Sequence, residues 1–216
     1  KALGKDMQAY GILEEMVAKN EESFSAHLEW RRALLEEGKI IEAQNFLFKA
    51  RRISPEIPRV YSLISSCKWK KNRLKEAELF ARKSILLDSK HLPGWRMLAE
   101  ISRRQKRLSE EVIYLRNLLK LEPDDMTLVD RLLIVFSKLG LNRKIMDLSA
   151  SRLKKIKSPE VLLLTAKAAY QEADFKLCNL FLKKFFSLGF VRADAFLLRG
   201  NLFILEKTVS YTHLTL

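Results

Sequence analysis

The sequence predicts an all-α protein made of repeated antiparallel helix pairs. Apolar residues recur at helical spacing, as for Tyr61, Ile64 and Cys67, and a second helical pattern follows after a short polar turn. The same arrangement returns 34 residues earlier and 34 residues later, which is typical of helical repeat arrays. Only seven Gly and five Pro among 216 residues fit helices joined by short turns.

The 34-residue period divides the chain into complete repeats with a half repeat at each end. We expect residues 1–23 to be the second helix of one repeat and residues 193–208 to be the first helix of another. The complete repeats are residues 24–57, 58–91, 92–125, 126–158 and 159–192. Because the pattern begins and ends within a repeat, we expect the chain to be a fragment of a longer array.

Small residues mark the second helices, and aromatic and small residues open the first helices. The first complete repeat has Gly38 in its turn, small residues at Ala43 and Ala50, and Pro55 near its end. The third repeat opens with Trp95, followed by Leu98 and Ala99. This pattern resembles the tetratricopeptide repeat. The resemblance implies a right-handed superhelical solenoid of antiparallel helix pairs.

A few residues depart from the repeat pattern. Arg31 stands where the first helix normally has Gly or Ala, and Glu111, Ile145 and Arg152 replace small residues of second helices. We expect these changes to affect the fourth repeat most, with a local change of superhelical pitch.

The last eight residues, 209–216, read VSYTHLTL and lack a helical period. We interpret them as a non-native, adapter-derived tail that does not belong to the fold. The alternative is a genuine terminus that frays.

The sequence shows no enzyme motif for phosphate, dinucleotide, zinc or serine-nucleophile chemistry. Its three histidines, His27, His91 and His213, are too few and too scattered for a metal site. Cys67 and Cys178 lie on apolar helix faces and are expected to be small buried residues. We therefore expect no catalytic residue, cofactor or metal. No apolar run reaches the length of a membrane span, and a cytoplasmic location is our expectation without a sequence signal that fixes it.

The resemblance implies that the first helices line a concave groove that holds peptides. The residues expected on this inner face are Arg32, Arg59, Ser62, Ser66, Trp69, Arg96, Glu100, Asp130, Arg131, Lys167 and Tyr170. Arginine, serine and tryptophan suit a peptide with acidic and apolar side chains. The alternative for each residue is ordinary solvated helix surface. The carboxylate clamp of the family is not reproduced, because its positions hold Leu28, Arg32 and Leu63.

The turns between paired helices carry the strongest charge pattern. Their basic residues are Lys70, Lys71, Arg73, Arg103, Arg104, Lys106, Arg107, Lys138, Arg143 and Lys144. The equivalent turns of the first and fifth repeats hold Glu36, Glu37, Glu172 and Asp174. Because such turns lie along one edge of a solenoid, we predict a basic ridge with acidic ends. Solubility and complementarity to helix dipoles are the alternative explanation.

These observations favour a non-catalytic scaffold that binds a protein or peptide, acidic in part. The formal net charge of +14 also allows nucleic-acid binding along the basic ridge. One position of successive first helices runs Leu28, Ser62, Arg96, Asp130 and Leu163, which is not a base-reading code, so such binding would be sequence-nonspecific. A third hypothesis is an accessory repeat region of a larger enzyme.

Overall fold

The computed structural model describes residue 41, residues 47–48, 50–52 and 55–213, and side chains as far as residue 205. The chain divides into two compact units, Lys1–Leu121 and Glu122–Leu216. The helix expected at residues 1–23, the first helix expected within residues 24–57 and the candidate groove residue Arg32 lie outside the described residues.

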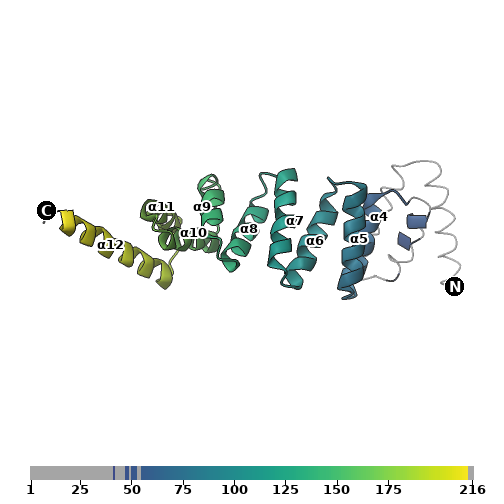
Figure 1. Cartoon of the computed structure of the whole chain (residues 1–216), viewed down its shortest axis with the longest axis horizontal. Coiled ribbons are helices and arrows are strands. Elements are labelled where there is room, and N and C mark those ends of the chain that lie inside the picture. Colours follow the sequence, from purple (N-terminus) through teal and green to yellow (C-terminus); the bar gives the residue numbers. More distant parts are fainter. Residues whose placement is uncertain (1–40, 42–46, 49, 53–54, 214–216) are drawn as a thin grey trace. The chain divides into compact units, whose positions relative to one another are not determined.

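From residue 55 on, the described part of the first unit consists of two helix pairs, and the described residues 41, 47–48 and 50–52 before them are also helical (Figure 1). Its helices are α4 (Pro58–Lys70), α5 (Leu74–Leu87), α6 (Leu92–Arg104) and α7 (Leu108–Leu121). Within each pair the second helix packs on the first, and α6 also packs on α4 and α5. The face formed by Tyr61, Ile64 and Cys67 is buried, so the predicted helical pattern is confirmed.

The second unit has two further pairs and a longer helix. Its helices are α8 (Met126–Lys138), α9 (Asn142–Ala150), α10 (Pro159–Gln171), α11 (Phe175–Ser187) and α12 (Ala193–His213). The structure is thus all-helical over the described residues, and the predicted repetition of helix pairs is confirmed.

The repeat that departs most from the pattern contains the shortest second helix of the described residues. Helix α9 has nine residues and ends before Arg152, a large residue at the position that is small, Ala50 and Ser84, in the first two complete repeats. Turns follow it, and the side chain of Ile156 is then fully buried. Lys184 of α11 donates hydrogen bonds to the carbonyl groups of Leu153 and Lys154, which stabilises this irregular segment.

The turn within each pair has one repeated geometry. Asn72, Lys106, Gly140 and Ala173 all have a left-handed backbone, with φ of 59°, 57°, 67° and 60°. The amide of the next residue bonds to a carbonyl five residues earlier each time, as in Arg73 N to Lys68 O at 2.9 Å. These are Schellman turns, which satisfy the last carbonyl groups of the first helix. Gly140 favours this backbone and Asn72 tolerates it, whereas Lys106 and Ala173 are residue types that rarely adopt it.

Small buried residues set how closely α4, α5 and α6 approach one another. Ala77, Ala81 and Ser84 are fully buried on α5, and Ser65 of α4 donates to the carbonyl of Ala77 at 2.6 Å. A Cβ atom added to Gly94 of α6 would lie 2.2 Å from the hydroxyl oxygen of Ser84. Glycine at this position therefore lets α6 approach α5 closely.

Both cysteines are buried and free, as predicted. Burial raises the pKa of the Cys67 thiol and of the Cys178 thiol to about 11. Each thiol is therefore neutral near pH 7 and packs as a small apolar group.

Helix α12 corrects one expectation about the end of the chain. We expected the helix to end at residue 208, but α12 continues through His213. The segment after Gly200 contains neither Gly nor Pro, so nothing in it breaks the helical backbone. That residues 209–216 are non-native stays a prediction. Over the described residues, no helix combines the length and apolar character needed to cross a membrane.

Replacing Gly94 by alanine should destabilise the protein by about 1–3 kcal/mol, because the new methyl group overlaps Ser84 and Ile85. Gly200→Ala is the matched control: its Cβ would meet nothing within 4 Å, and alanine favours a helix by up to about 1 kcal/mol. Urea unfolding followed by circular dichroism measures both. Equal effects of the two substitutions would contradict this account of the α5–α6 contact.

Candidate functional site

The structure separates the groove candidates of the first unit into buried and accessible side chains. Ser62 is buried, donates to the carbonyl of Arg59 at 2.9 Å and lies 3.0 Å from His91 Nε2. It cannot contact a ligand directly, so its assignment to the groove surface is corrected. Ser66 is partly exposed and donates to the carbonyl of Ser62.

Trp69 is half-buried, and its ring is covered by a basic side chain. The guanidinium carbon of Arg104 lies 4.9 Å from the ring centroid, within the range of a cation–π contact. Arg96 is exposed, and Glu100 forms an ion pair with Arg103 at 2.8 Å. In the first unit, candidate groove residues therefore interact with candidate ridge residues.

In the second unit, α10 forms one wall of a groove of about 610 Å³. Its floor is apolar, with Leu163 and Ala168 of α10 and Ile145 of α9 almost fully buried beneath it. The lining residues are Ser137, Gly140, Asn142, Ile145, Pro159, Glu160, Leu163, Leu164, Lys167, Ala168, Gln171 and Arg192. Lys167 is the one sequence-predicted groove residue among them.

The groove lining has two clusters of polar groups besides its apolar residues. Asn142 Nδ2 donates to Gln171 Oε1 at 3.1 Å and to Glu172 Oε1 at 3.3 Å. Lys167 Nζ lies 2.7 Å from Asp194 Oδ2, and Arg192 donates to both oxygens of Asp194 at 3.1 Å. The hydrogen bond from Lys167 holds the pKa of Asp194 below its ordinary value, so this carboxylate is charged.

Asp130, Arg131 and Tyr170 are not part of this groove lining. One carboxylate oxygen of Asp130 is buried without a hydrogen-bond partner among the described residues, and burial raises the pKa of Asp130. The Tyr170 ring packs against Phe175 with centroids 5.8 Å apart. Of the predicted groove residues in the second unit, Lys167 alone lies in this lining, together with residues that the sequence analysis did not predict as groove residues.

Arg107 of the predicted basic ridge belongs to a network that joins two repeats. Its guanidinium contacts Glu78 of α5 at 2.6 Å and Glu110 of α7 at 2.8 Å. Arg82 contacts the same Glu78 at 2.7 Å and donates to Tyr114 Oη at 2.8 Å. Burial alone would raise the pKa of Glu78, but hydrogen bonds from Arg107 and Arg82 outweigh it and lower this pKa. The charge of Arg107 is therefore used to hold α5 and α7 together and contributes little to the basic surface.

Other arginines of the ridge also have acidic partners. Arg73 pairs with Glu76 at 3.4 Å, and Arg143 in the second unit pairs with Glu172 at 3.2 Å. The lysines of the ridge are exposed: Lys70, Lys71 and Lys106 in the first unit, and Lys138 and Lys144 in the second. Paired arginines contribute less to the outward field than their number suggests.

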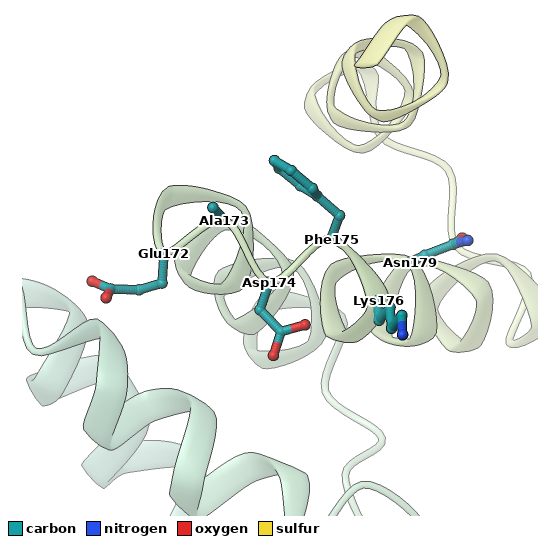
Figure 2. Close-up of a pocket in the computed structure, with 6 residues that line it drawn as sticks. All are labelled: Glu172, Ala173, Asp174, Phe175, Lys176 and Asn179. Atoms are coloured by element: carbon teal, nitrogen blue, oxygen red, sulfur yellow. The ribbon is translucent and has the colours of Figure 1, made fainter. Parts of the chain in front are cut away.

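A second recess, of about 620 Å³, lies at the turn between α10 and α11 (Figure 2). Figure 2 shows the carboxylates of Glu172 and Asp174 pointing away from the ring of Phe175. Asp174 accepts from the amide of Leu177 at 3.0 Å and caps α11. These side chains do not converge on a common point, so the recess offers no coherent site.

No protein-family model matches the sequence, and no curated protein matches it. Solved structures do match. YrrB, a TPR protein with an unusual peptide-binding site, is 13% identical, with a TM-score of 0.66 over 87% of this chain and 97% of that one. PilF of Pseudomonas aeruginosa is 20% identical, with a TM-score of 0.59 over 85% and 84%. The chain has the tetratricopeptide-repeat fold.

A third tetratricopeptide-repeat protein is similar to a smaller share of the chain. MamA from Desulfovibrio magneticus RS-1 is 13% identical, with a TM-score of 0.58 over 74% of this chain and 92% of that one. At these identities the likeness establishes the tetratricopeptide-repeat fold and not a shared partner.

Sequence analysis missed Asn142, Gln171, Arg192 and Asp194. A signal existed in retrospect, because partners in adjacent tetratricopeptide repeats lie 27 to 30 residues apart in these contacts. A search for oppositely charged residues separated by slightly less than the 34-residue period would have found Lys167 with Asp194 and Arg143 with Glu172.

Glu78→Gln should lower the free energy of unfolding by about 1–2 kcal/mol, because one carboxylate serves two arginines in a half-buried network. Glu56→Gln changes the same charge at an exposed position and should have an effect within about 0.5 kcal/mol. Urea unfolding compares the two. Similar losses in both variants would show that the network is not a specific source of stability.

His91 should make stability depend on pH. Burial lowers the pKa of His91, and Arg59 lowers it further while Asp88 opposes the change. As the pH decreases, His91 is therefore protonated at a higher pH in the unfolded state than in the folded state. The contribution of the neutral imidazole to stability is complete above about pH 6.5 and is lost as the pH decreases from there through the pKa of the folded state. Wild type should lose stability relative to His91→Gln between pH 7.5 and pH 5.5 in urea unfolding. A constant difference would contradict the burial of a neutral imidazole.

Proposed function

We propose that this protein is a non-catalytic scaffold that binds an extended segment of a partner protein in the groove beside α10. The observation that carries the proposal is the combination, in the lining of one open groove, of apolar side chains with amide and charged side chains. Protein binding is the usual role of tetratricopeptide repeats, and the neighbours with this fold are generally non-catalytic scaffolds.

The size and chemistry of the groove suit a short peptide segment. Its volume of about 610 Å³ falls in the range of ligand pockets, roughly 300–1,000 Å³. Asn142 and Gln171 each carry both a donor and an acceptor, which match the amide and carbonyl groups of an extended backbone. Leu164, which is partly exposed in the same lining, offers a contact for an aliphatic side chain of the peptide. YrrB, whose structure has a peptide-binding site, provides a precedent for peptide recognition on this fold.

Charge favours a partner that is acidic in part. The net charge of +14 and the exposed lysines of the ridge attract acidic segments over a distance that depends on salt. The same charge would support sequence-nonspecific nucleic-acid binding, but Arg73, Arg103, Arg107 and Arg143 already have carboxylate partners. These pairs reduce the field that phosphate would meet, and protein binding is the usual role of this fold, so we favour the protein partner. No observation favours the accessory region of an enzyme.

The test is selection of random dodecapeptides displayed on phage against the nuclease-treated full chain. Peptides selected on wild type should lose at least about tenfold in affinity for Leu164→Asp, because a carboxylate is introduced into an apolar contact. Leu86→Asp is the matched control on exposed surface of α5 and should bind as wild type does.

Two results would contradict the proposal. One is that no peptide is enriched, and the other is that the affinity of enriched peptides is the same for Leu164→Asp. Steeply salt-dependent binding of single-stranded DNA that is lost in Arg103→Glu/Arg104→Glu would instead support the nucleic-acid hypothesis.

A further inference from the structure

Asp194 is the carboxylate of an ion cluster at the edge of the groove. It is the second residue of α12, where an acidic side chain also favours the helix N-terminus. Arg192 approaches it with two nitrogen atoms, Nε to Oδ1 and Nη2 to Oδ2, both at 3.1 Å. Lys167 approaches Oδ2 at 2.7 Å. Both cations line the groove, and Asp194 does not.

The geometry around Asp194 is that of a bound carboxylate ligand. A two-point contact from arginine with a third contact from lysine is a strong arrangement for recognising a carboxylate. Here the protein supplies the carboxylate itself, and two positive charges face a single negative charge. The cluster therefore retains positive charge toward the groove.

The cluster is also accessible to solvent. The side chains of Lys167, Arg192 and Asp194 are 48%, 51% and 32% exposed. Ion pairs at such exposure contribute little to stability, so exchange of one carboxylate for another is not costly.

We infer that Asp194 is an intrachain competitor for a partner's aspartate or glutamate, which binds Lys167 and Arg192 by replacing it. This inference rests on the proposed function and adds the chemistry of the peptide and a residue that limits its affinity. In the free protein Asp194 holds the two cations; in the complex the carboxylate of the partner holds them.

The groove also fixes the position of that acidic residue along the peptide. Glu160 lines the same face of α10 two helical turns from Lys167, roughly 10 Å away, and repels a carboxylate at its own end. Leu163 and Leu164 lie one turn, roughly 5 Å, from Lys167. An extended peptide advances roughly 3.3 Å per residue with alternating side chains. The expected motif is therefore an acidic residue two positions from an aliphatic one.

The alternative role for Asp194 is to position Lys167 and Arg192 for the ligand. The two roles predict opposite effects of Asp194→Asn, which keeps the shape of the side chain and removes its charge. Loss of a competitor increases affinity, whereas loss of a positioning residue decreases it. This difference in sign makes the inference testable with one substitution.

The experiment uses the full chain and the dodecapeptides selected on phage, followed by fluorescence anisotropy of individual labelled peptides. Wild type should enrich the acidic–aliphatic motif. Lys167→Glu and Arg192→Glu should each weaken binding at least about tenfold, and Asp194→Asn should tighten it about two- to fivefold. Replacing the acidic residue of the peptide by glutamine should abolish the difference between wild type and Asp194→Asn.

Matched controls separate these effects from net charge. Lys183→Glu makes the same charge change as Lys167→Glu at an exposed position of α11 outside the groove lining. Asp147→Asn makes the same change as Asp194→Asn on exposed surface of α9. Both controls should bind within about twofold of wild type.

Two outcomes would overturn the inference alone. In the first, the enriched peptides require Leu164 for binding but show no preference for an acidic residue. In the second, the Asp194→Asn variant binds an acidic peptide no more tightly than wild type does. Failure to enrich any peptide would overturn the proposed function and this inference together.

Discussion

Close approach of neighbouring helices is the constraint on which the first unit depends. On α5 the fully buried residues are small, Ala77, Ala81 and Ser84, and Gly94 of α6 leaves no space for even one more carbon atom beside Ser84. At such distances first helices such as α4 and α10 are buried over most of their circumference. Exposed polar residues such as Arg96 and Lys167 occupy the narrow surface of the first helices that stays open, on which the proposed binding relies.

The fold could be predicted because this constraint is visible in the sequence. Small residues recur with the period in the first two complete repeats, and Tyr61, Ile64 and Cys67 fall on one helical face that is buried as expected. Local backbone geometry was less predictable. Lys106 and Ala173 adopt the left-handed conformation of the turn without being glycine, since two backbone hydrogen bonds and the packed helices impose it.

The candidate site was less predictable, because it depends on contacts between repeats. Arg107 appeared in the sequence as one of several basic turn residues, yet its partner Glu78 lies 29 residues earlier, on the preceding helix pair. Ser62 has the helical position of a groove residue, but the neighbouring His91 covers its hydroxyl. A periodic pattern gives the face of the helix on which a side chain lies. It does not give the side chain that the next repeat brings against that face.

Net charge is therefore a poor guide to where this protein binds. Many of its positive charges are paired, since arginines of the turns form ion pairs with carboxylates of their own or adjacent repeats. What distinguishes the groove beside α10 is the ratio within one cluster, two cations to a single aspartate, together with an apolar floor less than two helical turns away. An acidic segment gains little from displacing a one-to-one surface pair, because the released carboxylate must be solvated while no charge is newly neutralised. At Lys167 and Arg192 the exchange also leaves the number of ion pairs unchanged, but the excess positive charge attracts the incoming carboxylate, and burial of an aliphatic neighbour in the same step supplies the gain.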